Sequence, residues 1–154
     1  QSGSVYLKGE KYKLLMGKQE IFCDEQSVWT YLKDINEVQI NDYEANKEDI
    51  TPSNMFTIYQ NDFNYMMNGE EMVDKTNCAI VDLMPKDKTK PFFKVRIWID
   101  KNVKYIKRMK VFDKNGNLYT YNVTSFNSKE SLDDSFFKFD AGKHPGVRVE
   151  DLRM

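Results

Sequence analysis

The chain has 154 residues, of which 40% are hydrophobic and 31% are charged, and its 24 acidic residues nearly balance its 23 basic ones. A chain of this length can bury a core without metals or disulfide staples, so we predict a single domain over residues 1–154. The balanced charge gives no overall field that would attract nucleic acid. No apolar run reaches the roughly 18 residues that a membrane-spanning helix needs. We therefore expect neither nucleic-acid binding nor a membrane span.

The first residues of the chain bear on its processing, and its two cysteines bear on its redox state. The chain begins with QSGS rather than with Met, so we expect that an N-terminal segment has been removed by processing or truncation. Cys23 and Cys78 lie far apart and lack the C-x-x-C spacing or the neighbouring His of zinc and redox sites. We expect two buried thiols, with a disulfide as the alternative if the protein is exported.

The first forty residues predict a meander of short strands. Segments of β-forming residues alternate with turn signals at Gly9-Glu10 and Gly17-Lys18. In the fourth segment, Trp29 and Tyr31 point to one face of the strand and the residues between them to the other. The predicted strands are residues 4–8, 11–16, 19–23, 27–33 and 37–40.

The segment TPSNMFTIYQ, residues 51–60, has helical rather than alternating spacing. It follows a polar stretch that we predict to be a loop, Thr51 can cap a helix, and Pro52 suits the first helical position. A helix this short is unstable alone, so we expect it to pack on the concave side of a sheet. Its expected apolar face contains Met55, Ile58 and Tyr59, with Phe56 beside them.

Strand patterns resume after the helix and continue to the tail. Asn115-Gly116 is a hairpin signal, and alternation in residues 93–100 predicts a sheet with one apolar and one wet face. We expect the tail after residue 133 to pack its three phenylalanines and to end in a short apolar stub. The further predicted strands are residues 63–67, 77–84, 93–100, 105–113 and 118–126. About ten strands in meander order favour a single curved antiparallel sheet or an open barrel over a βαβ fold.

Residues that could carry catalysis are sparse. His144 is the one histidine, and we interpret it as a solvated loop residue because a general base needs an orienting partner and a nucleophile. No phosphate-binding, dinucleotide-binding or metalloprotease motif occurs. We therefore predict that the protein is not an enzyme, with no catalytic residue, no metal site and no cofactor.

Two further features each have two interpretations. The basic residues near 104–110 alternate with an aromatic residue, as in single-strand nucleic-acid binders, but flanking Asp100 and Asp113 favour a solvated outer face. The eight Met, ten Phe, nine Tyr and two Trp suit either a pocket for a flexible ligand or an ordinary core, and composition favours the core. The basic residues are Lys104, Lys107, Arg108 and Lys110.

The order of several segments resembles one family. IFCDEQSVWTYLKDINEVQI, the TPSNMFTIYQ helix, VDLMPKDKTKPFFKVRIWIDKNVKYIKRMKVFDKNGNLYTYNVTSF and DDSFFKFD resemble LolA-type outer-membrane lipoprotein carriers of Gram-negative bacteria. The resemblance implies a mainly β (α+β) fold, a half-open antiparallel barrel with an apolar concave face under a helical lid. Family members begin with a helix and a strand before the position of QSGSVYLKG, so we expect a missing edge strand and an incomplete lid.

The resemblance also implies roles for individual residues. Tyr12 and Leu14 match an apolar pair on an early strand that lines the family's cavity, and Trp29 and Tyr31 match its V-W-x-Y strand. Lys8 falls near an Arg that latches the lid, although Lys lacks the planar fork of Arg. The predicted cavity residues are Tyr12, Leu14, Met16, Trp29, Tyr31, Met55, Phe56, Ile58, Tyr59, Met67 and Ile97.

Three functions follow as hypotheses. The first is a periplasmic, chaperone-like carrier that binds lipoprotein acyl chains or fatty acid, receives cargo from an inner-membrane releasing complex and passes it to an outer-membrane acceptor. The alternative is a protein-interaction or envelope sensor module that binds a peptide or partner protein, with β-augmentation at an open edge as its mode. The third hypothesis is an enzyme on the same scaffold. The sequence offers no orienting partner or nucleophile that would pair with His144 in catalysis.

Overall fold

The computed structural model describes residues 2–43 and 62–154. Strands hold 56% of these residues, so the prediction of a mainly β fold is confirmed. The predicted helix at 52–60 lies outside the described residues, together with Met55, Phe56, Ile58 and Tyr59. The chain divides into two compact units, each built on its own sheet, and the single-domain prediction stays a prediction.

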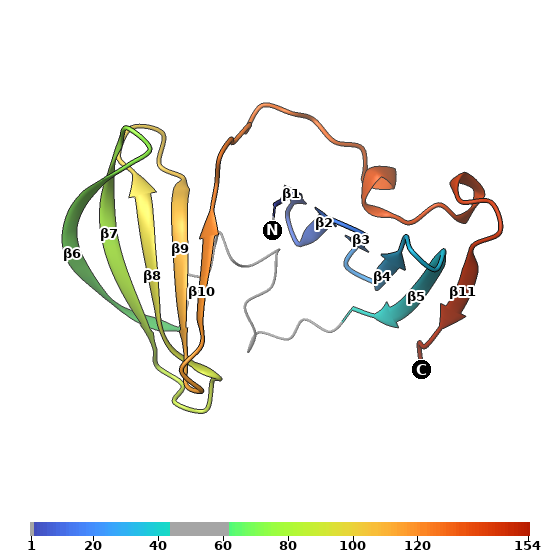
Figure 1. The fold of residues 1–154 in the computed structure, drawn as a ribbon, viewed down its shortest axis with the longest axis horizontal. Helices are drawn as coiled ribbons and strands as arrows, with labels where there is room; N and C mark the ends of the chain where they lie inside the picture. Colours follow the sequence, from blue (N-terminus) through green and yellow to red (C-terminus); the bar gives the residue numbers. More distant parts are fainter. Residues whose placement is uncertain (1, 44–61) are drawn as a thin grey trace. The chain divides into compact units, whose positions relative to one another are not determined.

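The first unit is built on a six-stranded sheet with the order β1-β2-β3-β4-β5-β11 (Figure 1). The five predicted strands form an antiparallel meander, with left-handed Gly9 and Gly17 at the first two turns. β11 adds to β5 in parallel, where the sequence analysis predicted only an apolar stub. The strands are β1 (Gly3–Lys8), β2 (Lys11–Met16), β3 (Gln19–Cys23), β4 (Ser27–Leu32), β5 (Glu37–Asp42) and β11 (Arg148–Asp151).

The strand register assigns each side chain of this sheet to one of two faces. Leu14 lies opposite Ile21, and Ile21 lies opposite Thr30, so these residues share a face. Tyr31 lies opposite Val38, on the other face. We name these the Leu14 face and the Tyr31 face. Along β4, Val28, Thr30 and Leu32 belong to the Leu14 face, whereas Trp29 and Tyr31 belong to the Tyr31 face, which confirms the predicted alternation.

The C-terminal tail covers part of the Tyr31 face. It forms two short 3-10 helices, η2 (Asp134–Phe137) and η3 (Ala141–Lys143). The Phe139 ring lies 5.7 Å from Phe22 and 5.2 Å from Tyr31, in ring-edge and tilted arrangements. Phe137 is fully buried. The prediction that the tail packs its phenylalanines is therefore confirmed.

Ion pairs attach the same tail to the sheet. The Nζ atoms of Lys8 and Lys11 each lie 2.7 Å from an oxygen of Asp134. These two hydrogen bonds, that of Lys11 first, lower the pKa of Asp134 to about 2. Lys138 pairs with the nearly buried Asp24 at 3.2 Å. The tail is thus held by charge as well as by aromatic packing.

His144 differs from the solvated loop residue that the sequence suggested. Its ring stacks on Phe139 and meets Tyr31 edge-on, with centroid separations of 4.5 Å in both pairs. Its Nδ1 lies 3.0 Å from the Asp140 carbonyl oxygen. Because an imidazole packs well against aromatic rings, the aromatic tail partly buries this histidine, and the solvated interpretation is wrong.

The second unit is a five-stranded antiparallel sheet with the order β10-β9-β8-β7-β6 (Figure 1). All five predicted strands are present, and the Asn115-Gly116 turn joins the last two, with Gly116 at φ +87°. β6 extends six residues past its predicted end at residue 67. β10 ends at Asn122, before its predicted end at residue 126. The strands are β6 (Phe63–Val73), β7 (Thr76–Pro85), β8 (Phe92–Asp100), β9 (Ile106–Asp113) and β10 (Leu118–Asn122).

One face of the second sheet is apolar. Two cross-strand rows run over all five strands, and their central members are almost fully buried: Val95 and Ile97 are 0% exposed. We name this the Ile97 face. The first row is Met67, Val81, Ile97, Met109 and Tyr121, and the second is Tyr65, Leu83, Val95, Val111 and Tyr119.

The opposite face of the second sheet is polar around an ion pair. Asp82, which is 3% exposed, accepts hydrogen bonds from Arg96 Nε at 2.6 Å and Nη2 at 2.8 Å. These bonds lower the pKa of Asp82. Trp98 is an apolar exception, buried against its neighbours while its Nε1–H donates to Glu71 at 2.6 Å. The predicted wet face is thus present but interrupted.

The basic cluster also differs from its simple interpretation as a solvated outer face. Lys107 is only 7% exposed and lies 3.9 Å from Asp74. Arg108 and Lys110 lie over the Trp98 ring, at 5.5 and 5.9 Å from its centroid. Cation–ring contacts of this kind stabilise a sheet surface. The cluster therefore contributes packing and is not uniformly solvated.

Neither sheet closes on itself within the described residues, since β1 and β11 end one and β10 and β6 end the other. Cys23 and Cys78 are both buried free thiols, as predicted. Burial raises the pKa of the Cys23 thiol to about 11. No helix in the part of the chain that the structure describes is long and apolar enough to cross a membrane.

Candidate functional site

The Leu14 face brings three predicted cavity residues together. Tyr12, Leu14 and Met16 alternate along β2, so their side chains leave the same side of the sheet. Tyr12 is 7% exposed, and burial raises the pKa of its hydroxyl to about 12. Leu14 and Met16 are half-buried. The row is therefore an apolar surface whose edge remains in contact with solvent.

The register extends this surface over four strands. The apolar neighbours of the β2 row are Val5 and Leu7 on β1, Ile21 on β3, and Val28 and Leu32 on β4. Most of them are half-buried, and Leu7 is 37% exposed. Sequence reasoning missed these residues, although the alternation in each strand would have identified them once the register was known. The Leu14 face thus carries a largely apolar patch, in which Gln19 and Thr30 are the polar members on β3 and β4.

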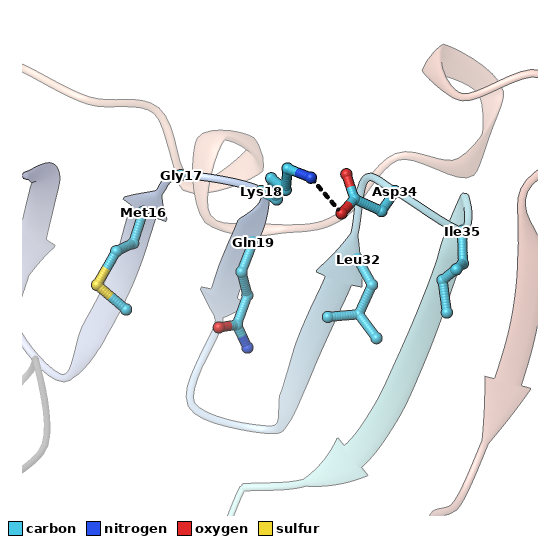
Figure 2. A pocket seen from close by; sticks show the side chains of 7 residues that line it. All are labelled: Met16, Gly17, Lys18, Gln19, Leu32, Asp34 and Ile35. Carbon is cyan, nitrogen blue, oxygen red and sulfur yellow. Dashed lines mark hydrogen bonds and ion pairs between the residues drawn. The ribbon is translucent and has the colours of Figure 1, made fainter. Parts of the chain in front are cut away.

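A shallow depression lies at one end of the Leu14 face (Figure 2). Met16, Gln19 and Leu32 come from three neighbouring strands, and Ile35 follows in the next turn. Lys18 and Asp34 form an ion pair of 2.7 Å at the rim. The depression has a volume of about 470 Å³. Met16, Leu32 and Ile35 give it an apolar lining with the Gln19 amide among them, and its rim is charged, which suits a chain-like ligand with a polar end.

The Ile97 face brings the other two described apolar candidates together. Met67 and Ile97 belong to the same cross-strand row. Ile97 is 0% exposed, whereas Met67 is 61% exposed at the edge of the sheet. Tyr119 and Tyr121, which are about half exposed, lie at the other edge. Flexible or aromatic side chains therefore flank a buried aliphatic centre.

Trp29 and Tyr31 do not lie with the other candidates. They occupy the Tyr31 face, opposite to Tyr12, and the tail packs Phe139 and His144 against Tyr31. Tyr31 is 9% exposed, and its hydroxyl donates to Asn36 at 3.0 Å. These two residues cannot line one surface with Tyr12, Leu14 and Met16, because alternate residues of a strand point to opposite sides.

Lys8, the predicted latch, bonds to the tail. Its Nζ donates to the Leu132 carbonyl oxygen at 2.9 Å and to Asp134 at 2.7 Å. Lys8 lies opposite Lys11, so it belongs to the Tyr31 face. The lid that it was predicted to latch lies outside the described residues. The contacts that the structure shows place Lys8 as a tail anchor.

These features define a mainly β protein with extended apolar faces on two sheets that are largely antiparallel. Comparison with protein families gives its membership: the model described as "Outer membrane lipoprotein carrier protein LolA" matches residues 15–140. Since this match covers most of the chain, the protein belongs to the LolA family, and the resemblance seen in the sequence is confirmed. A comparison with curated proteins finds no match.

Two solved structures align with this chain, and the first, with a TM-score above 0.5, shows a likeness of fold. An uncharacterised conserved protein from Thermus thermophilus aligns with a TM-score of 0.60 and 13% identity, over 93% of this chain and 76% of that one. A LolA superfamily protein from Nitrosomonas europaea aligns with a TM-score of 0.42 and 12% identity, over 78% of this chain and 59% of that one. The chain thus spans about three fifths of the length of the second relative.

Proposed function

We propose that the protein is a carrier that binds the acyl chains of lipoproteins, or fatty acid, on the Leu14 face. The observation that carries this proposal is a largely apolar surface over β1 to β4, half-open to solvent and interrupted by Gln19 and Thr30, in a member of a lipoprotein carrier family. Soluble proteins seldom leave large contiguous apolar patches without a ligand or partner for them. An acyl chain supplies the matching apolar surface.

The mechanism needs no chemical step. Burial of each CH2 group of an acyl chain is worth about 0.8 kcal/mol, so a long chain gains affinity from length alone. Aliphatic side chains such as Leu14 and Ile21 impose little directional selectivity, and Met16 adapts to different chain shapes. The charged rim formed by Lys18 and Asp34 suits the polar end of a ligand. Binding and release are then equilibria set by buried area.

Several parts of the proposal rest on the family and the sequence. We place the protein in the periplasm, with an inner-membrane donor and an outer-membrane acceptor as partners. We also propose that the two sheets belong to one half-open barrel and that the 52–60 helix is its lid. On this view the Ile97 face, with Met67 and Ile97, contributes to acyl-chain binding as well.

The sharpest test uses two adjacent leucines of β2. Leu14 lies on the Leu14 face, whereas Leu15 lies on the other side of the strand opposite Glu20, and both are half-buried. Leu14→Gln should weaken binding of a fluorescent fatty acid by about tenfold, since the change places a polar amide against the acyl chain. Leu15→Gln should leave the affinity within about twofold of the original. Gln is chosen because an acidic residue at position 15 would place a like charge beside Glu20.

The outcome is read from a titration together with a melting curve. Equal loss of affinity in the two variants, with unchanged melting temperatures, would sink the assignment of the Leu14 face. Native mass spectrometry of the purified protein, followed by organic extraction, supplies a second readout. A copurified acyl chain that disappears in the Leu14→Gln protein would support the proposal, and a protein that neither copurifies with nor takes up lipidated peptide would contradict it.

A second candidate function is favoured by β6. This strand is an edge of the second sheet, pairs with β7 alone among the described strands, and is 11 residues long. Tyr65, Met66 and Met67 on it are each more than half exposed. An apolar edge strand is a template for β-augmentation by a partner peptide. Met66→Pro should abolish peptide capture on this view and leave fatty-acid affinity unchanged.

A further inference from the structure

A second kind of surface lies at one end of the β6–β10 sheet, around Phe93. Phe93 is 52% exposed and Leu118 is 53% exposed, and both lie at the same end of the sheet. The surrounding segments, 85–94 and 112–118, are rich in Lys. We name this group the Phe93 patch. Its members are Phe93, Phe112, Leu118, Lys86, Lys88, Lys94 and Lys114.

The apolar members of the Phe93 patch lie together. The Phe93 and Phe112 ring centroids are 6.0 Å apart. Leu118 lies directly opposite Phe112 across the β9–β10 pair. Phe112 in turn lies opposite Lys94, whose Nζ is 4.1 Å from the Phe112 ring centroid. Exposed Phe93 and Leu118 therefore flank the half-buried Phe112 ring, and the three side chains form one apolar spot.

The charge around this spot is strongly positive, although the whole chain is nearly neutral. Segments 85–94 and 112–118 contain five Lys against two Asp. The structure shows carbonyl partners for two of the ammonium groups: Lys114 Nζ donates to the Lys88 carbonyl oxygen, and Lys88 Nζ to that of Pro85 at 3.4 Å. Carbonyl oxygens leave a net positive charge in place, unlike the carboxylate of an ion pair.

The two acidic residues of segments 85–94 and 112–118 have local hydrogen-bond partners. Asp87 accepts hydrogen bonds from the backbone N–H and the hydroxyl of Thr89, at 2.8 and 2.7 Å. Asp113 accepts from the Asn115 backbone N–H in the hairpin turn. Both carboxylates thus stabilise loop geometry, whereas Lys86, Lys88 and Lys114 of the same loops are exposed and Lys90 is 8% exposed.

We propose that the Phe93 patch docks the protein on a phospholipid surface that contains anionic headgroups. Exposed aromatic rings insert favourably at the boundary between headgroups and acyl chains, and each nearby Lys is attracted to the negative surface. The combination of an apolar spot with a cationic surround matches such a surface in both respects. The patch shares no residue with the Leu14 face, so this inference is independent of the proposed acyl-chain site.

The test measures binding to vesicles. The intact protein should cosediment with vesicles of phosphatidylcholine and phosphatidylglycerol at low salt, and binding should fall steeply when salt shortens the Debye length to below about 8 Å. Vesicles of phosphatidylcholine alone should bind about tenfold less, because the electrostatic attraction is then absent. No binding to the anionic vesicles would overturn the proposal.

Matched variants separate the patch from general surface charge. Phe93→Ser and the double change Lys86→Glu with Lys88→Glu should each reduce binding about tenfold or more. Phe126→Ser and Lys104→Glu are the controls: Phe126 is 57% exposed, and Lys104 is an exposed residue of the β8–β9 turn, at the other end of the strand from Phe93. Equal losses in the controls would overturn the proposal.

A spectroscopic variant reports insertion directly. Phe93→Trp places an indole in the patch, and its emission should shift to the blue on addition of anionic vesicles but not of neutral ones. The original protein, with Trp29 and Trp98, supplies the background to subtract. An unchanged difference spectrum with anionic vesicles would show that the Phe93 patch does not insert into the lipid surface, and would overturn the proposal.

Discussion

At the scale of single residues, the two thiols are the simplest to predict. Cys23 and Cys78 are both 0% exposed, and burial raises the pKa of each thiol. Since the thiolate is the reactive species, neither should react with a thiol reagent at neutral pH in the folded protein, and both should react in denaturant. Counting labelled thiols by mass spectrometry checks this. Rapid labelling under native conditions would contradict the buried placement.

The Asp82–Arg96 pair is the most consequential polar contact of the second sheet. Asp82 also accepts a hydrogen bond from Asn68 at 3.0 Å, so Asp82→Asn weakens three bonds at once. Loss of one partner from a buried pair costs about 3–5 kcal/mol, and partial exposure of Arg96 reduces this to about 2 kcal/mol here. Chemical denaturation should show the loss, and Asp34→Asn in an exposed pair should cost less than about 0.5 kcal/mol.

The Asp82–Arg96 pair also predicts how the stability of the protein changes with pH. Because hydrogen bonds from Arg96 lower the pKa of Asp82 below 3.8, its contribution to stability is present above that pH and lost as the pH falls through the folded value. The original protein should therefore lose more stability than the Asp82→Asn variant on acidification. Parallel acid-unfolding curves for the two proteins would contradict this account.

At the scale of elements, the tail is a structural part of the first unit. Phe137 is fully buried within η2 and meets the Phe136 ring edge-on at 5.5 Å. Phe137→Ala should cost about 3–4 kcal/mol through lost burial and the remaining cavity. Phe126→Ala, at an exposed position, should cost less than about 1 kcal/mol. Thermal or denaturant unfolding measures both, and similar losses would show that the tail packing is not as described.

The strands were the part of the fold that the sequence predicted well. Alternation and turn residues such as Asn115-Gly116 are local, so they predicted ten of the eleven described strands. β11 was missed because a four-residue parallel strand has no turn to mark it, and its pairing with β5 spans more than a hundred residues. In β11 only Glu150 is half-buried and the other three residues are exposed. The strand therefore lacks the alternation of apolar and polar residues that identifies a strand in a sequence.

The site was predicted less completely, and the reason is register. The sequence correctly placed Trp29 and Tyr31 on one face of β4, but one strand alone does not show which face meets the tail. Only the pairing of β2, β3 and β4 assigns Leu14 and Ile21 to one side and Tyr31 to the other. A set of candidates carried over from a family by position therefore mixed two faces, which the structure separates.

At the scale of the whole molecule, an acyl-chain carrier should be stabilised by its cargo. A ligand that binds only the folded state at about 100 times its Kd stabilises that state by about 2.7 kcal/mol. For a protein of this size, that corresponds to a rise in Tm of about 5–10 °C. Myristate below its micelle concentration is a suitable ligand, and differential scanning fluorimetry measures the shift.

The two β2 variants make this measurement specific to a face of the sheet. The Leu15→Gln protein should keep the rise in Tm on addition of myristate, because Leu15 lies opposite Glu20 on the Tyr31 face. The Leu14→Gln protein should lose most of the rise at the same concentration, since its binding surface is interrupted and its folded state gains less from the ligand. Equal shifts in both variants would mean that the acyl chain is bound elsewhere than on the Leu14 face. The difference between two neighbouring residues on one strand thus decides whether the proposed acyl-chain site lies on the Leu14 face.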